Sequence, residues 1–283
     1  METRIIAGRE VCAIGMGVMP LSFDTSVTED QAMRTVCAAL DAGVQLLDTA
    51  TCYVPNAESP GHNERIAAAG VRAWGGDADS VLIASKGGHH RASETDFPKD
   101  GRPEAIHAYC DASLAALGTD CIDLYQYHWV DPKVPLVETM GAFRDLKEAG
   151  KIRAVGLSNV TVEEVEAASS VVEIASVQNR LSPDLLDSVP VVRHCAERGI
   201  AFLPYCPLGG SGKAAATLGE RLPAFGEVAS RHGVSPQQVA LAWMLALSPN
   251  IIPIPGARRP ETIVDSAGAA DLRLTPRDLA TLG

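Results

Sequence analysis

Four residues that can move or hold protons lie at or just beyond the ends of separate apolar runs. They are Asp48, Tyr53, Lys86 and His128. A lysine at the end of a buried strand is costly to desolvate unless a group of opposite charge pairs with it. If the runs are parallel barrel strands, their last residues meet at one face, which is where such barrels do chemistry.

This combination suits proton donation to an oxygen that gains negative charge. A free tyrosine has a pKa of about 10, and a nearby ammonium favours its phenolate and lowers that value. We expect Lys86 to tune Tyr53 as a general acid and Asp48 to hold Lys86 charged and oriented. His128 can donate a hydrogen bond to a carbonyl oxygen, so the four groups suit hydride addition to a carbonyl. Any one of them alone is more often structural, but four at separate strand ends favour the catalytic interpretation.

The elements that must position these residues follow an alternating pattern. Short apolar runs predict strands near residues 13–17, 44–48, 81–86, 123–128, 153–157, 174–178, 200–204 and 250–254. Helix-period segments fall near residues 29–42, 63–74, 103–117, 136–149, 161–169, 188–198, 235–247 and 260–268. This alternation predicts an α/β protein, a (β/α)8 TIM barrel as one domain over residues 1–283, with a doubly wound sheet as the structural alternative. Residues 1–12 predict a short N-terminal β-hairpin that caps the bottom of the barrel, and residues 217–232 an extra helix before helix seven.

Composition limits the classes of function. The net charge is −11 with acidic residues spread along the chain, which argues against nucleic acid as a partner. No stretch approaches 18 apolar residues, so we expect no membrane span. The seven cysteines lack a C-x-x-C pair and predict free thiols in a reducing, cytoplasmic setting. Oligomeric state cannot be read from these features.

Longer motifs carry a resemblance to a known family. They are Asp48-Thr49-Ala50 with Tyr53, Gly61-His62-Asn63-Glu64, Ser85-Lys86-Gly87, and residues 117–124, 150–159 and 252–257. In this order and spacing the chain resembles an aldo-keto reductase over nearly its whole length. The resemblance implies the barrel, a nicotinamide cofactor, and a catalytic tetrad of Asp48, Tyr53, Lys86 and His128.

The resemblance also implies where the cofactor lies. Ser158, Asn159 and Gln178 match contacts to the nicotinamide amide, and Tyr205 matches the aromatic residue that stacks on the ring. A glycine-rich loop lies near the pyrophosphate, where barrels often bind phosphate, and comprises Pro207, Leu208, Gly209, Gly210, Ser211 and Lys213. An earlier turn lines the pocket and comprises Gly17, Val18 and Met19.

The segment after the last expected strand bears on the choice of cofactor. Gly256 and Ala257 precede the adjacent arginines Arg258 and Arg259 at a helix start. Guanidinium groups there would grip an adenosine 2′-phosphate and favour NADPH, whereas the alternative is a solvated pair of charges. Further cofactor contacts are expected at Thr262, Asp265 and Ser266, where many family members instead carry an arginine, an acidic residue and an asparagine.

The remaining pocket residues concern the substrate. Cys52 and Trp129 flank Tyr53 and His128 and are expected to line the substrate pocket. His89 and His90 are adjacent, but no metal-ligand spacing joins them to cysteines or carboxylates, so the sequence assigns no metal.

We therefore expect an NADPH-dependent oxidoreductase that reduces an aldehyde or ketone, a small-molecule carbonyl substrate, to an alcohol. Two alternatives stay open. One is a cofactor-binding regulatory subunit of the channel β-subunit type, and the other is an NAD(P)-dependent alcohol or sugar dehydrogenase working in the oxidative direction.

Overall fold

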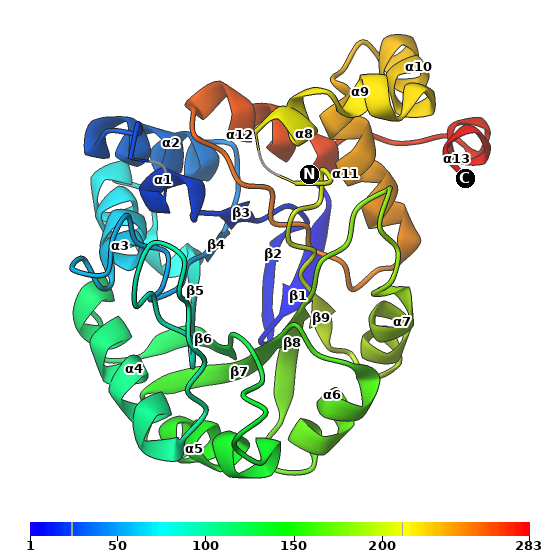
Figure 1. Cartoon of the computed structure of the whole chain (residues 1–283). Coiled ribbons are helices and arrows are strands. Elements are labelled where there is room, and N and C mark those ends of the chain that lie inside the picture. The colour runs from blue at the N-terminus through cyan, green and yellow to red at the C-terminus, as the bar shows by residue number, and fades with distance from the viewer. Residues whose placement is uncertain (24, 211) are drawn as a thin grey trace.

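A curled parallel sheet forms the centre of the molecule, with helices around its outside (Figure 1). The computed structural model describes residues 1–23, 25–210 and 212–283. Neighbouring strands are hydrogen-bonded in chain order, as expected for successive β/α units. The strands are β3 (Met16–Gly17), β4 (Leu46–Asp48), β5 (Leu82–Gly87), β6 (Ile122–Tyr127), β7 (Ile152–Ser158), β8 (Ile174–Gln178) and β9 (Ala201–Phe202).

The expected eighth strand, over residues 250–254, is replaced by a bridging segment. Isolated parallel bridges join this part of the chain to both β9 and β3, and Gly17 donates its N–H to the Pro255 carbonyl at 3.1 Å. Pro253 and Pro255 have no N–H, so the segment cannot form a continuous ladder. The predicted barrel is confirmed, but it closes through these bridges and not through a regular strand.

Eight helices alternate with the strands, each within two residues of its predicted start and end. They are α2 (Glu29–Asp41), α3 (His62–Trp74), α4 (Pro103–Leu117), α5 (Leu136–Glu148), α6 (Val162–Ser169), α7 (Val189–Glu197), α11 (Pro236–Leu247) and α12 (Pro260–Ala267). Local signals explain these boundaries. Thr28 caps α2 by accepting the Gln31 N–H, and Ser235 caps α11 by accepting the Gln238 N–H.

Further helices lie outside the alternating pattern, and the hydrophobic periodicity of the sequence missed most of them. They are α1 (Pro20–Phe23), η1 (Ala78–Ser80), α8 (Lys213–Ala216), α9 (Leu218–Arg221), α10 (Pro223–His232), η2 (Gly268–Ala270) and α13 (Pro276–Leu282). The extra helical segment expected over residues 217–232, before α11, is confirmed, but it is divided into two helices, α9 and α10. Pro223 disfavours a helical conformation at Leu222, which has φ −127° and ψ 79°.

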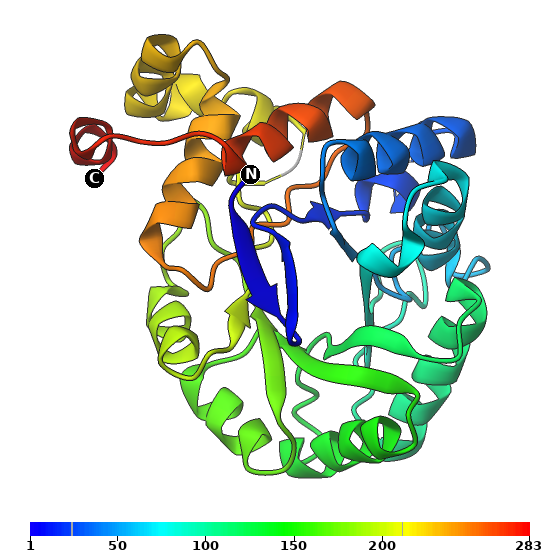
Figure 2. The same cartoon turned by 180° about the vertical axis from the view of Figure 1, so that it is seen from behind.

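The N-terminal hairpin closes one end of the barrel, as predicted. Strands β1 (Thr3–Ile6) and β2 (Arg9–Cys12) pair antiparallel and lie across the barrel in the view of Figure 2. Ile6 and Val11 are buried in one apolar cluster with residues of β4, β5 and β6 that point into the barrel. The opposite end, at the carboxyl ends of the strands, is left for chemistry.

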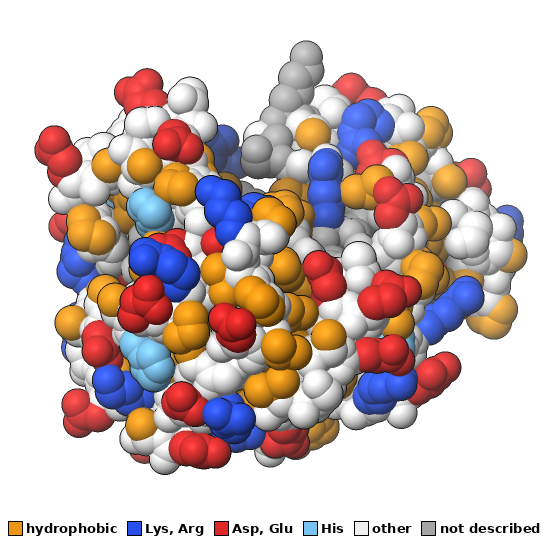
Figure 3. All heavy atoms as spheres, turned by 60° about the horizontal axis from the view of Figure 1, so that its bottom comes forward, with side chains coloured by type: hydrophobic (Ala, Val, Ile, Leu, Met, Phe, Trp, Pro, Cys, Tyr) orange, Lys and Arg blue, Asp and Glu red, His pale blue; other side chains and the backbone are white. Residues whose placement is uncertain are grey.

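On the face seen in Figure 3, acidic and basic side chains of the described residues are interspersed. Within the described ranges, no helix combines the length and the apolar character needed to cross a bilayer.

Candidate active site

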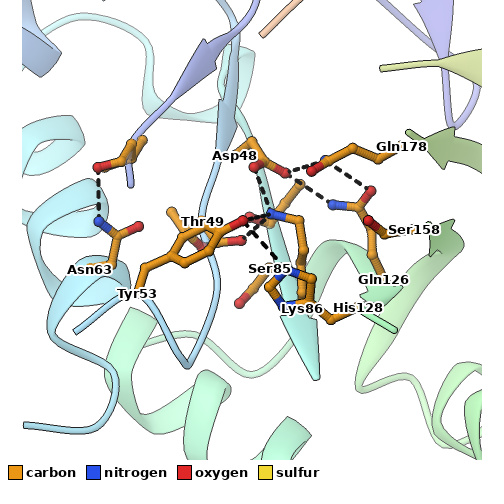
Figure 4. Close-up of polar contacts among 12 residues, drawn as sticks. Asp48, Thr49, Tyr53, Asn63, Ser85, Lys86, Gln126, His128, Ser158 and Gln178 are labelled. Atoms are coloured by element: carbon orange, nitrogen blue, oxygen red, sulfur yellow. Dashed lines mark hydrogen bonds and ion pairs between the residues drawn. The ribbon is translucent and has the colours of Figure 1, made fainter. Parts of the chain in front are cut away.

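The four residues expected to be catalytic come together at the carboxyl end of the barrel (Figure 4). Lys86 donates from Nζ to Asp48 Oδ2 at 2.6 Å and to the Tyr53 hydroxyl at 3.1 Å. The Tyr53 hydroxyl lies 3.4 Å from Nε2 of His128. The hydroxyl is therefore held between an ammonium and an imidazole.

Parallel pairing of neighbouring strands explains this convergence. Asp48 is the last residue of β4 and pairs with Ala84 of β5, so Lys86 extends one inward-facing position further. On β6, Gln126 pairs with Lys86. His128 lies two residues after Gln126 and directly follows the end of the strand. The side chains at the ends of these three strands therefore lie at successive levels along the barrel axis, at the carboxyl end of the barrel.

Asp48 has more partners than the sequence analysis foresaw. Its Oδ1 accepts from Gln178 Nε2 at 2.7 Å and from Gln126 Nε2 at 3.1 Å, while the Thr49 carbonyl accepts a further bond from Lys86 at 2.9 Å. Gln126 was missed, although its place two residues before His128 in an apolar run was a usable signal. Gln178 was expected at the nicotinamide amide, and here its amide nitrogen is engaged with Asp48.

Burial controls the charge states in this cluster. Lys86 is fully buried and Asp48 is 3% exposed. Desolvation, with the Asp48 charge next, raises the pKa of Tyr53 well above its usual value. Desolvation, followed by the Lys86 charge, holds the pKa of His128 well below its usual value. The expected lowering of the Tyr53 pKa by Lys86 is therefore not observed, and burial keeps Tyr53 a neutral phenol and His128 a neutral imidazole.

A cavity of about 1420 Å³ extends from the tetrad to the N-terminal end of α12. It is lined by Asp48, Tyr53 and His128 and by most residues predicted to contact cofactor or substrate. These are Gly17, Met19, Trp129, Ser158, Gln178, Tyr205, Pro207, Leu208, Gly256, Ala257, Arg258, Arg259, Thr262, Asp265 and Ser266.

Other predicted residues lie behind this lining. Val18 is fully buried, and its carbonyl accepts from Asn63. Cys52 is buried beside His128, and burial raises the pKa of its thiol to about 12. Gly209 is not among the lining residues and adopts φ +86°. Ser211 lies outside the described residues, and Lys213 begins α8.

Asn159 fixes the walls of the catalytic end of the cavity. It adopts φ +58°, which is uncommon for a residue other than glycine but tolerated by asparagine. Its Nδ2 donates to the His128 carbonyl at 3.1 Å, and its Oδ1 accepts from the Tyr205 hydroxyl at 2.8 Å. Asn159 is not itself a lining residue, so its structural part is to hold His128 and Tyr205 in position.

The far end of the cavity is bordered by exposed arginines. Arg258 and Arg259 both line it, and Arg259 Nε lies 3.3 Å from Glu261. The Gln31 side chain of α2 donates to the Arg258 carbonyl at 2.7 Å, which links α2 to the segment just before α12. Gly210 of the expected glycine-rich loop also lines the cavity, as do Ile254 and Pro255 of the 252–257 motif. Lining residues that no motif marks are Pro20, Phe23, Thr25, Ser26, Val27, Gln31, Cys206, Gly212, Ala215, Ala216, Gln237 and Glu261.

Comparison with known proteins places this geometry in a family. The sequence model of the aldo/keto reductase family matches residues 13–283. An uncharacterized oxidoreductase of Schizosaccharomyces pombe is 30% identical, with the alignment covering 95% of this chain and 85% of that protein.

Solved structures agree with the sequence comparison. An aldo/keto reductase from Klebsiella pneumoniae, crystallised with NADP and acetate, is 28% identical, with a TM-score of 0.78 and coverage of 99% of this chain and 94% of the other. A second structure from that organism, in complex with NADPH, is 27% identical, with a TM-score of 0.79 and coverage of 99% and 93%. The match over nearly the whole length shows that the chain belongs to the aldo/keto reductase family of oxidoreductases.

Proposed function

We propose that this enzyme reduces an aldehyde or ketone to an alcohol with NADPH, using Tyr53 as the proton donor. The observation that carries the proposal is the position of the Tyr53 hydroxyl. It lies 3.1 Å from Lys86 Nζ and 3.4 Å from His128 Nε2, and it faces a cavity that extends to the two arginines.

The residues present fit a dinucleotide cofactor. The cavity is large enough for one and has polar groups at the catalytic end and arginines at the other. Ser158, Gln178 and Tyr205 would hold the nicotinamide, and Arg258 with Arg259 would hold the 2′-phosphate. The relatives from Klebsiella pneumoniae were crystallised with NADP and NADPH, which supports this choice. When bound, the cofactor supplies the hydride that reduces the carbonyl carbon.

The chain's own residues handle the charge that develops on oxygen. His128, neutral and oriented through its neighbours, donates a hydrogen bond to the carbonyl oxygen. Tyr53 gives its proton to that oxygen, which is a far stronger base than phenolate once it becomes an alkoxide, so a raised Tyr53 pKa does not prevent transfer. Lys86 stabilises the phenolate that remains, and Asp48 keeps Lys86 charged and aimed at it.

Aromatic side chains suit an apolar group on the substrate. Phe23 and Trp129 line the cavity beside Tyr53 and His128. Lys99 Nζ lies 4.8 Å from the centre of the Trp129 ring, which places a cation against one of these aromatic side chains. We therefore propose an aldehyde or ketone with an apolar body as the substrate class.

The test is NADPH consumption over a panel of aliphatic, aromatic and sugar carbonyls, with Tyr53→Phe as the matched control. Carbonyl-dependent turnover in the wild type and its loss in the variant would support the proposal. Tight NADPH binding without turnover on any member of the panel would favour the regulatory-subunit alternative. Turnover only in the alcohol-oxidising direction would favour the dehydrogenase.

A further inference from the structure

Three potential metal ligands meet beside the catalytic tyrosine. Cys52, His89 and His128 follow the ends of β4, β5 and β6, and their donor atoms all lie within 4.8 Å of one another. Among the described residues this is the one such group with at least three members. The sequence analysis assigned no metal because the three are far apart in the chain, and only the parallel strands bring them together.

The donor atoms of this cluster face one another. Cys52 Sγ lies 3.5 Å from Nδ1 of His128 and 3.9 Å from Nδ1 of His89. The other nitrogen of His89, Nε2, lies 2.8 Å from the Phe97 carbonyl, which can only accept, so Nε2 carries the proton. The Nδ1 lone pair of His89 is therefore directed at the cluster. A backbone carbonyl on the second nitrogen is the usual means of orienting a metal-bound histidine.

His128 also offers the right nitrogen. Its Nε2 faces the Tyr53 hydroxyl, which leaves Nδ1 on the side of Cys52. The rings of His89 and His128 meet at 86° with their centres 5.1 Å apart, so neither covers the other's donor edge. Cys52 and His128 are buried and His89 is half-buried, and of the three only His128 lines the cavity.

The spacing matches a tetrahedral ion. With Zn–S of about 2.3 Å and Zn–N of about 2.0 Å, two ligands at a tetrahedral angle lie roughly 3.5 Å apart. The two sulfur–nitrogen distances are 3.5 and 3.9 Å and all three donor atoms lie within 4.8 Å of one another, so His89 must move toward Cys52 and His128 to complete the geometry. One thiolate and two imidazoles favour zinc or cadmium over magnesium or calcium, which require oxygen ligands.

We propose that Cys52, His89 and His128 form an inhibitory site for a zinc-like divalent cation within the catalytic pocket. Binding forms a metal–sulfur bond as the Cys52 thiol releases its proton to solvent, and the fourth position stays open to water. The ion takes His128 out of position for the carbonyl and adds positive charge near Lys86. The inhibitory effect rests on the proposed carbonyl reduction, whereas the binding itself does not.

Binding is tested without any activity measurement. Cofactor-free protein is titrated with Co²⁺ and Cd²⁺ while the thiolate-to-metal absorption is recorded, and Zn²⁺ is then used to displace Co²⁺. We expect one equivalent of metal and a thiolate band. Cys52→Ser should lose the band, and both Cys52→Ser and His89→Ala should weaken binding more than about 100-fold, since even outer partners of metal ligands contribute 10- to 100-fold.

Two variants serve as matched controls. Cys206→Ala removes a thiol that lines the same cavity, and His90→Ala removes an imidazole whose Nδ1 lies 2.8 Å from the Tyr109 hydroxyl. Both should keep the wild-type band and affinity. Thermal unfolding without metal verifies that every variant is folded. A wild type without a thiolate band, or equal affinity in Cys52→Ser and wild type, would overturn the site.

The inhibitory effect is then measured separately. With a carbonyl that the enzyme reduces, Zn²⁺ should raise the apparent KM for that carbonyl and leave NADPH affinity unchanged. Zinc that binds with the thiolate band but leaves turnover unaffected would overturn the inhibitory part. If no carbonyl is reduced, the spectroscopic titration still decides the site, so the two proposals fail in distinguishable ways.

Discussion

The coupling between Lys86 and Asp48 gives the sharpest test of the site's electrostatics. The side chains are 0% and 4% exposed, and their charged atoms lie 2.6 Å apart. Removing one partner of a buried pair costs about 3–5 kcal/mol, because the other charge is left uncompensated, whereas replacing both with neutral groups of similar volume is often neutral. Asp48→Asn and Lys86→Met should each lower the free energy of unfolding by about that amount. The double variant should be more stable than either single variant.

Asp48→Asn should be the more destabilising single change. It leaves an ammonium without a charged partner and with neutral acceptors alone, such as the Thr49 carbonyl and the Tyr53 hydroxyl. Lys86→Met leaves a carboxylate that still accepts from the side chains of Gln126 and Gln178, and a carboxylate can also take up a proton. For catalysis we expect the reverse order, because Lys86 touches the Tyr53 hydroxyl and Asp48 acts through Lys86.

The assay is urea unfolding followed by circular dichroism and fluorescence, whose agreement verifies a two-state transition. A surface pair serves as control: Lys151 and Asp111 are 39% and 56% exposed, and their coupling should stay within about 1 kcal/mol. For Lys86 and Asp48 we expect a coupling of about 3 kcal/mol or more. If their effects add within about 0.5 kcal/mol, the pair is not coupled and Lys86 is held by its other contacts.

Three further predictions concern the acid, the cofactor and pH. Tyr53→Phe should cut turnover by about 10²–10⁴-fold with little change in NADPH affinity, and near-normal turnover would reject Tyr53 as the acid. Replacing Arg258 and Arg259 with alanine should weaken NADPH binding by about 100-fold or more and NADH binding far less, since each arginine–phosphate hydrogen bond contributes roughly 1.5 kcal/mol or more; fluorescence titration measures both affinities. The lowered pKa of His128 means that the unfolded chain takes up a proton below about pH 6.5 while the folded state stays neutral. The contribution of His128 to the free energy of unfolding is therefore present above that pH, and below it this free energy falls by up to about 1.4 kcal/mol per pH unit. If the free energy of unfolding depends on pH equally in the wild type and in His128→Gln, this prediction is wrong.

The tetrad could be predicted because each member lies at or beyond a strand end. Parallel strands place such residues at one edge whatever the details of packing, so Asp48, Lys86 and His128 converge as expected. The charge states could not be predicted in the same way. Their direction depends on burial, and the effects of burial and of the Asp48 charge on the Tyr53 pKa can be weighed only once the neighbours are placed.

Local backbone chemistry decided where the fold predictions failed. A short apolar run predicted a strand over residues 250–254, but such a pattern ignores the N–H groups that prolines lack. In the same way Pro223 divides the helix expected over residues 217–232. The cavity residues 25–27 carry no motif, because they are brought to the cofactor site only by the packing of α2 beside α12.

The two ends of the barrel have different energetic roles. At one end, Ile6 and Val11 of the hairpin bury apolar surface against the barrel interior, which stabilises the fold. At the other end lie a buried ion pair and two non-glycine residues with positive φ, Asn159 and Cys206, which each cost stability. Asn159 shows what this strain provides, since its bonds hold the His128 backbone and the Tyr205 hydroxyl together. Ala7 in the hairpin turn also has positive φ, so backbone strain occurs at both ends, but the buried ion pair lies only at the catalytic end, and the apolar burial at the other end supplies stability.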